Sequence, residues 1–279
     1  MRSNNFILLI FAALMLTAAA CERKTETPSL KKEESPSSTP GPQTTNAQVI
    51  TGRDGAPMVL VPQGVFFMGT NDGKLEEGPR MNVFLEAFYI DRFEISNERF
   101  TEFVKKTGYA PQKDFSYPAG MERHPARGIS WNDAKAYCEW AGKRLPLEYE
   151  WEKAARGPDG RRWPWGEEHK SPKSQIQNLK SKIIESIPEY DDPAGQSPYG
   201  CLHMADNVWE WVDDWFGPYV LSNENDPRFG QKFKALRGGW VARAKGIEYS
   251  KTTDRMALAP DKREDFVGAR CAMDAPIGK

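Results

Sequence analysis

The 279-residue chain has few of the residues on which most metal and nucleotide sites depend. It has only three His, and its four Cys are scattered at Cys21, Cys138, Cys201 and Cys271, which excludes a zinc ribbon or a dense disulfide framework. It has no Gly-rich phosphate loop followed by Lys and no Gly-x-Ser-x-Gly elbow. Acids number 39 against 38 bases, so there is no basic surplus to bind nucleic acid.

The amino-terminal apolar stretch is too short to cross a bilayer as a helix. It covers fifteen uncharged residues, Phe6–Ala20, whereas a spanning helix needs roughly 20. It follows Arg2 and ends in small residues before Cys21, a pattern typical of a bacterial lipoprotein signal peptide. We therefore predict a signal peptide over residues 1–20 and lipidation of Cys21. The alternative is ordinary secretion, with Cys21 left as a free thiol.

The segment 21–48 has the composition of a tether. From Glu22 onward it is rich in Ser, Thr, Pro, Lys and Glu and has no aromatic residue, Val or Ile. Such a segment cannot bury enough apolar surface to offset its chain entropy, so we expect it to be disordered. With a lipid on Cys21 it would hold an exported domain at the cell envelope. Glu22, in place of Asp, favours the outer membrane in a host that has two membranes.

A folded domain is predicted over residues 49–276, followed by a short tail at 277–279. Within 59–69 two short apolar strands flank a Pro-Gln-Gly turn, and 84–94 is a further extended candidate. After Gly157 no long periodic segment appears. The nine Trp all lie between Trp131 and Trp240, and we expect most of them in the core.

Three helices are predicted from capping signals. The first follows Ser96 and ends at Gly108, with apolar residues on one face. The second begins at a capping box that starts at Ser130 and ends at Gly142, and the third covers Leu147–Arg156. Short strands, three helices and long irregular segments together indicate a single α+β domain without internal repeats.

An ordered series of motifs covers almost the whole folded region. The longest is GKRLPLEYEWEKAARG at 142–157, and the others are Gly64–Gly69, Glu94–Asn97, Ile129–Ala134, Trp163–Gly166, Asn207–Trp211, Arg237–Gly239 and Gly268–Arg270. In this order they resemble the signature of the formylglycine-generating enzyme (sulfatase-modifying factor) family. The resemblance implies a compact, loop-rich α+β fold, distantly similar to C-type lectin domains.

The metal ligands of that family's chemistry are missing. Formylglycine-generating members oxidise a Cys in a sulfatase peptide with oxygen and copper(I), and two Cys shortly after the Gly-Gly motif bind the soft metal. Here residues 238–248 contain no Cys, Trp240 replaces the usual Ser, and Arg243 adds a positive charge. We therefore expect no bound copper and assign no catalytic residue.

A calcium ion is compatible with the motif Asn207–Trp211. The resemblance implies a site in which Val208 offers its carbonyl and Glu210 its carboxylate, both oxygen ligands that a hard cation requires. Asn178 resembles the start of a second calcium site. The alternative is that Glu210 only hydrogen-bonds the surrounding loop.

The resemblance also suggests roles for three of the thiols. Cys138 and Cys271 occupy positions that form a disulfide in some family members, and export provides the oxidising conditions it needs. Cys201 replaces an apolar residue, so we expect a buried, unpaired thiol.

Two classes of function remain open. The first is a non-catalytic, membrane-tethered protein that uses the family's cleft to bind a peptide or protein partner in the envelope, or that has a structural role there. The second is an envelope oxidoreductase or tailoring enzyme of the family with an altered active site. In either case the cleft candidates are Trp240, Arg243, Glu248 and Arg255.

Overall fold

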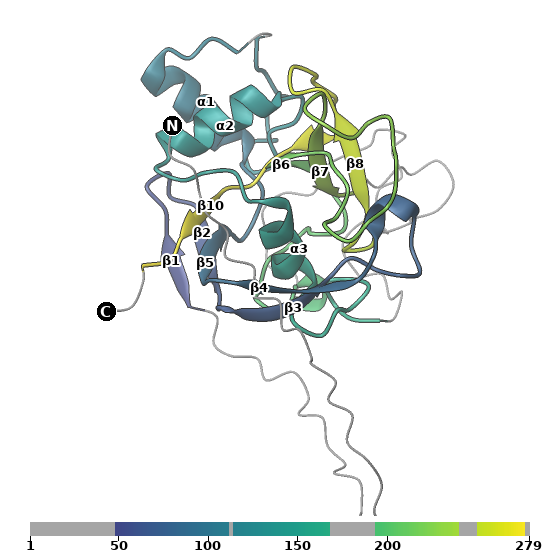
Figure 1. Ribbon diagram of the computed structural model, residues 1–279. Helices are drawn as coiled ribbons and strands as arrows, with labels where there is room; N and C mark the ends of the chain where they lie inside the picture. Colours follow the sequence, from purple (N-terminus) through teal and green to yellow (C-terminus); the bar gives the residue numbers. More distant parts are fainter. Residues whose placement is uncertain (1–47, 112–113, 168–192, 240–249, 277–279) are drawn as a thin grey trace, which may run out of the picture. The chain divides into compact units, whose positions relative to one another are not determined.

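The computed structural model describes residues 48–111, 114–167, 193–239 and 250–276 (Figure 1). The predicted signal peptide, Cys21, nearly all of the predicted tether and the 277–279 tail therefore lie outside the described residues. Within the described ranges, no helix combines the length and the apolar character needed to span a membrane.

The described part of the domain contains three sheets and three α-helices. In chain order the elements are β1 (Val49–Thr51), β2 (Pro57–Val61), β3 (Gly64–Met68), η1 (Leu75–Glu77), β4 (Met81–Leu85), β5 (Phe88–Asp91), α1 (Asn97–Thr107), α2 (Trp131–Trp140), α3 (Glu148–Arg156), η3 (Pro193–Gly195), β6 (Trp209–Trp215), β7 (Lys234–Gly238), β8 (Arg255–Leu258), β9 (Val267–Gly268) and β10 (Ala272–Asp274). The sheet orders are β1-β2-β5-β10, β3-β4 and β8-β7-β6-β9, and among the strand pairs of the described residues only β6–β9 is parallel. The predicted α+β class is confirmed.

The two strands predicted around the Pro-Gln-Gly turn are present as β2 and β3, but they belong to different sheets. β2 pairs with β5, whereas β3 pairs with β4. The buried ammonium group of Lys153, on α3, donates to the carbonyls of Pro62 (2.7 Å) and Gly64 (3.0 Å). The turn is therefore held by a helix that lies far along the chain.

The single extended segment expected over 84–94 is wrong, because the chain breaks after Leu85. The residues of β4 alternate between buried and more exposed positions, as on a sheet with one solvated face. All four residues of β5 are buried, because β5 lies between β2 and β10 in the first sheet. One continuous strand cannot occupy both environments.

The three predicted helices are confirmed. α1 follows Ser96 and ends at Gly108, whose φ of 68° is left-handed. α2 begins at the capping box of Ser130, whose hydroxyl accepts from the Asp133 N–H. α3 ends at Gly157, as expected, but every one of its residues except Tyr149 is buried. The short strands after Gly157 had no periodic signal in the sequence.

The core consists of two apolar clusters, and neighbouring residues of β6 and of β7 belong to different ones. One surrounds α3 and includes Trp151, and the other lies between α1, α2 and β6 and includes Trp211. Figure 1 shows α1 beside α2, and α3 between β3–β4 and the β6–β7–β8 strands. Both Trp side chains are fully buried, whereas Trp215 is 39% exposed. Most described Trp are at least half-buried, as expected.

The described thiols have two different roles. Cys138 on α2 forms a disulfide with Cys271, 133 residues further along the chain, and so ties α2 to the residue directly before β10. Cys201 is a free, buried thiol, and burial raises its pKa to about 11. A raised pKa keeps this thiol protonated and unreactive.

Candidate functional site

A polar cavity of about 260 Å³ lies where three loops meet. The first loop follows β3, the second follows α3, and the third precedes β8. The lining residues are Gly69, Thr70, Asp72, Gly73, Arg80, Arg156, Asp159, Gly160, Arg162, Glu167, Lys251 and Thr253. Almost all of them are charged, hydroxylated or glycine, so the cavity suits a polar ligand.

The first loop is fixed to α3 through Gly69. Its N–H donates to Glu152 Oε1 at 2.7 Å, and its carbonyl accepts from Arg156 Nη1 at 2.9 Å. A Cβ at this position would lie 2.8 Å from the carbonyl oxygen of Glu77, and the φ of 74° is left-handed. Only glycine fits here without displacing the loop.

The second loop is held by the same helix. Arg156 Nη2 donates to the Gly160 carbonyl at 2.6 Å, while Arg156 Nη1 also donates to Glu152 Oε1 at 2.8 Å. Gly157 closes α3 with its N–H on the Lys153 carbonyl. One buried guanidinium group therefore sets the positions of two loops of the cavity.

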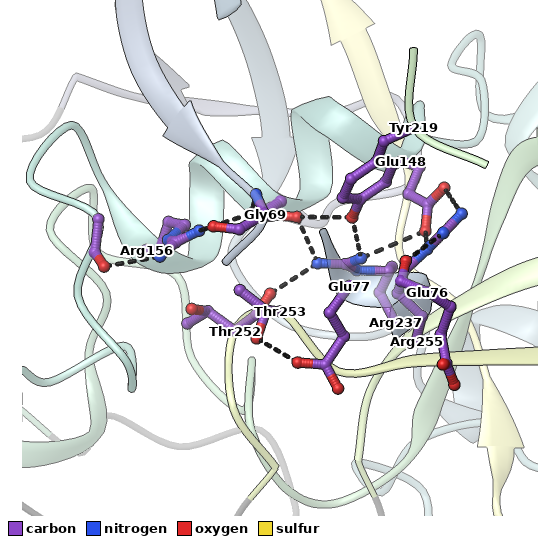
Figure 2. A network of polar contacts seen from close by, with 12 residues as sticks. Gly69, Glu76, Glu77, Glu148, Arg156, Tyr219, Arg237, Thr252, Thr253 and Arg255 are labelled. Atoms are coloured by element: carbon purple, nitrogen blue, oxygen red, sulfur yellow. Dashed lines mark hydrogen bonds and ion pairs between the residues drawn. The ribbon is translucent and has the colours of Figure 1, made fainter. Parts of the chain in front are cut away.

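The third loop is attached through Arg237 and two threonines. Arg237 Nη2 donates to the Thr252 carbonyl at 2.6 Å, and the Thr252 hydroxyl donates to the Arg161 carbonyl at 2.9 Å. The Thr253 hydroxyl donates to Glu77 Oε2 at 2.9 Å. Figure 2 shows the bonds from Arg237 to Thr252 and from Thr253 to Glu77 within a network of polar contacts.

Beneath the cavity lies a buried ionic layer centred on Arg237. Its guanidinium group is inaccessible to solvent and contacts Glu152 (2.7 Å), the Tyr219 hydroxyl (3.1 Å) and Glu148 (3.2 Å). Arg255 binds the same Glu148 with two hydrogen bonds of 2.6 and 2.7 Å (Figure 2). Such two-pronged pairs are the strong form of charge-assisted hydrogen bond.

The pKa values of the acidic groups in this layer depend on their burial and on the charges beside them. Burial acts to raise the pKa of Glu148, but Arg255 and Arg237 outweigh it and hold that pKa below its usual range. Burial, with the charge of Glu152, raises the pKa of Tyr219. Burial also raises the pKa of Glu77, despite the Thr253 hydrogen bond. Glu148 therefore stays charged and Tyr219 stays protonated at neutral pH.

The sequence-predicted cleft residues have different outcomes. Trp240, Arg243 and Glu248 lie outside the described residues. Arg255 is only 4% exposed and does not line this polar cavity. Its place is in the ionic layer, because a guanidinium group paired twice with buried Glu148 is removed from solvent.

Three basic lining residues were missed in the sequence, namely Arg80, Arg162 and Lys251. The motifs Gly64–Gly69 and Trp163–Gly166 lie next to these residues in the sequence, but they predicted only the family and its fold. Nothing in the local pattern says that three basic residues distant in sequence meet at one cavity.

The calcium candidates lie in a second buried cluster. Glu210 accepts from Arg270 with both oxygens, at 2.7 Å each, and from Trp151 Nε1 at 2.8 Å. Calcium needs six to eight free oxygen ligands. The described ranges hold no group of three or more His, Cys, Asp or Glu able to bind a metal. The carboxylate of Glu210 is therefore already engaged by protein donors and does not fit a calcium site, and Asn178 lies outside the described residues.

The cysteines of the described residues do not fit a copper site either. Of the four Cys, Cys138 and Cys271 are joined to each other and Cys201 is fully buried. Copper(I) in this fold requires two thiolates, and the described residues offer no such pair. We derive no chemical step through copper.

Glu94, His203 and Asp206 lie close to Glu210 and Arg270. Asn207 Nδ2 donates to Glu94 at 2.8 Å, and His203 Nδ1 lies 3.3 Å from Asp206. Burial raises the pKa of Glu94 to about 7, against the opposing charges of His203 and Arg270. Burial acts to lower the pKa of His203, but Asp206 and Glu94 raise it overall. The folded state therefore binds protons at this cluster more tightly than the unfolded chain does.

The ionic layer predicts a large effect on stability. Arg237→Met removes the central cation and leaves buried acids undercompensated, so the free energy of unfolding should fall by about 3–5 kcal/mol. Arg228→Met is the matched control, because Arg228 is 42% exposed and pairs with Asp226 at the surface. Exposed pairs contribute about 1 kcal/mol or less. Denaturant titration measures both, and equal losses would contradict the assignment.

The Glu94 cluster predicts a pH dependence of stability. A carboxyl group whose pKa is raised on folding stabilises the protein below its unfolded pKa and loses that contribution as the pH rises. The free energy of unfolding of the wild type, minus that of Glu94→Gln, should therefore fall by roughly 2–3 kcal/mol between about pH 5 and about pH 8. Urea titrations across this range measure it, with exposed Glu98→Gln as control. A difference that does not change with pH would refute the prediction.

Comparison with known proteins identifies the family. The model of the sulfatase-modifying factor enzyme 1-like domain matches residues 44–275. The formylglycine-generating enzyme of Mus musculus is 30% identical, over 78% of this chain and 75% of the relative. The inactive C-alpha-formylglycine-generating enzyme 2 of Mus musculus is 32% identical, over 78% of this chain and 86% of the relative.

A solved structure agrees with the fold. PvdO from Pseudomonas aeruginosa superposes with a TM-score of 0.60 at 24% identity, over 82% of this chain and 98% of PvdO. Its likeness extends to the fold alone. The matched domain and the sequence relatives together show that the chain belongs to the sulfatase-modifying factor (formylglycine-generating enzyme-like) family.

Proposed function

We propose that this protein is a membrane-tethered member of the family that binds a peptide or protein partner of the cell envelope and has no copper-dependent cysteine oxidase activity. The observation that carries the proposal is that each of the four Cys has another role or location than binding copper. Cys138 and Cys271 are used in a disulfide, Cys201 is buried, and Cys21 lies at the end of the apolar amino-terminal stretch.

Two further observations support a binding role. The family includes relatives described as inactive, so its fold persists without the oxidase reaction. Buried charged side chains bind the loops of the polar cavity, which suits a binding role because such a site is formed before the ligand arrives. The competing function is an envelope oxidoreductase with an altered active site, which the similarity to formylglycine-generating enzymes favours.

Metal analysis with an activity assay separates the two functions. The purified protein, loaded with copper(I) and desalted, should retain no stoichiometric copper, because a thiolate pair is missing. It should also consume no oxygen with a Cys-containing sulfatase peptide. An active formylglycine-generating enzyme treated identically is the positive control. Stoichiometric copper together with oxidation of the peptide would overturn the proposal.

The membrane tether predicts a lipid on Cys21. In a bacterial host fed labelled palmitate, the wild-type chain should carry the label and sediment with membranes, because a lipidated Cys binds firmly to a bilayer. Cys21→Ser should lose the label and the membrane association. Cys201→Ala is the control, since Cys201 is buried in the folded domain. Unchanged labelling of Cys21→Ser would contradict the prediction.

A further inference from the structure

Three basic side chains face the cavity without a polar partner. The guanidinium groups of Arg80 and Arg162 and the ammonium group of Lys251 line it, and none of them makes a hydrogen bond or ion pair with another described residue. Arg80 and Lys251 come from segments about 170 positions apart in the sequence. Unpaired cations that converge on one cavity indicate a ligand that carries negative charge.

Both arginines are held by aromatic rings. The guanidinium carbon of Arg80 lies 4.0 Å from the centroid of Phe67, and that of Arg162 lies 5.7 Å from the centroid of Trp163. Gly160 makes room for the first stack, because a Cβ there would lie 3.3 Å from both Arg80 Nη2 and the Phe67 side chain. The contact of Arg80 is the closer of the two, and a guanidinium group packed on a ring keeps N–H donors available to an oxyanion.

Two of the charged groups at the cavity are already neutralised. Asp159 is paired with Arg161, with Nη2 to Oδ2 at 2.6 Å. Arg156 is paired with Glu152 at 2.8 Å, within the buried layer. These pairs shape the cavity but leave no net charge to attract a ligand.

The remaining lining charges leave one positive charge in excess. Against the three bases stand two acids, Asp72 and Glu167, and among the described residues Glu167 accepts from the backbone N–H of Arg162 (2.9 Å), which carries no charge. Glu77, behind Thr253, lies 3.9 Å from Lys74 Nζ. One surplus charge is matched by a monoanion, whereas the two acids would repel a phosphate dianion about twice as strongly as a monoanion.

The size of the cavity limits what enters it. A volume of about 260 Å³ is below the roughly 300–1,000 Å³ of pockets that enclose a whole drug-sized ligand. It is large enough for one terminal group or side chain of a larger molecule. Asp72 and Glu167 can accept N–H donors from the chain that carries this group, as a peptide backbone would supply.

We propose that the cavity binds the carboxylate group of a peptide, with Arg80 and Arg162 donating from their guanidinium edges and Lys251 supplying the third positive charge. The inference rests on the proposed binding function and names the chemistry of its ligand. The carboxylate comes either from an acidic side chain or from the carboxyl terminus of the peptide.

Three short peptides and inorganic phosphate serve as probes of the full-length protein in detergent. Acetyl-Gly-Gly-Gly carries a terminal carboxylate, acetyl-Gly-Glu-Gly-amide carries a side-chain carboxylate, and acetyl-Gly-Gln-Gly-amide carries none. Calorimetric or NMR titration should give at least one carboxylate peptide an affinity about tenfold above that of the Gln peptide. The tighter of the two carboxylate peptides identifies the source of the group. The affinity should weaken with added salt.

Single variants test the assigned residues. Arg80→Met and Arg162→Met should each weaken the carboxylate peptide about tenfold, because each removes a charge-assisted contact. Lys106→Met is the matched control, since Lys106 is 61% exposed on α1 and does not line the cavity. Thermal unfolding and circular dichroism identify the variants that keep the fold.

The outcomes separate this inference from the proposed function. Equal affinity for all three peptides, binding that Arg80→Met and Arg162→Met leave unchanged, or phosphate that binds as tightly as the carboxylates would each overturn the carboxylate site. None of these results restores copper chemistry. Oxidation of a sulfatase peptide would overturn the proposed function and leave a measured carboxylate site intact.

Discussion

The ion pair between Arg237 and Glu152 is the interaction on which the arrangement of this domain depends. Both side chains are inaccessible to solvent, and a buried charge is tolerated only when a partner and further hydrogen bonds compensate its desolvation. The Glu152 carboxylate accepts hydrogen bonds from Arg237, Arg156 and the N–H of Gly69. Arg237 also donates to the carbonyl of Thr252. Because these groups come from α3, β7 and two loops, the pair sets the geometry of the cavity as well as the core.

Glu210 is a second buried carboxylate whose charge is compensated by an arginine of the protein. The family's motif is retained there, yet the carboxylate is fully used by Arg270 and Trp151. A guanidinium group supplies one positive charge and several fixed donors, so it stabilises a buried carboxylate without a bound ion. In this domain the position therefore serves the core, which is consistent with the binding role that we propose.

Much of the architecture follows from local sequence. The capping box at Ser130, the left-handed Gly108 and the stop at Gly157 are short-range signals, and the helices that they predict are present. The motif series predicts the family, and with it the Cys138–Cys271 bridge. The break of 84–94 into β4 and β5 was missed, because the identity of the pairing strand decides which residues are buried.

Composition and motif order by themselves determined the α+β class, the family, the missing thiol pair and the absence of a basic surplus. These properties depend on which residues are present and on their order, so no contact needs to be known. The tertiary structure alone decided that Arg255 is buried on Glu148 while Arg80, Arg162 and Lys251 face a cavity. The charge of an arginine is the same in both places, and only the long-range contacts that fix its burial and its partners distinguish a structural cation from one available to a ligand.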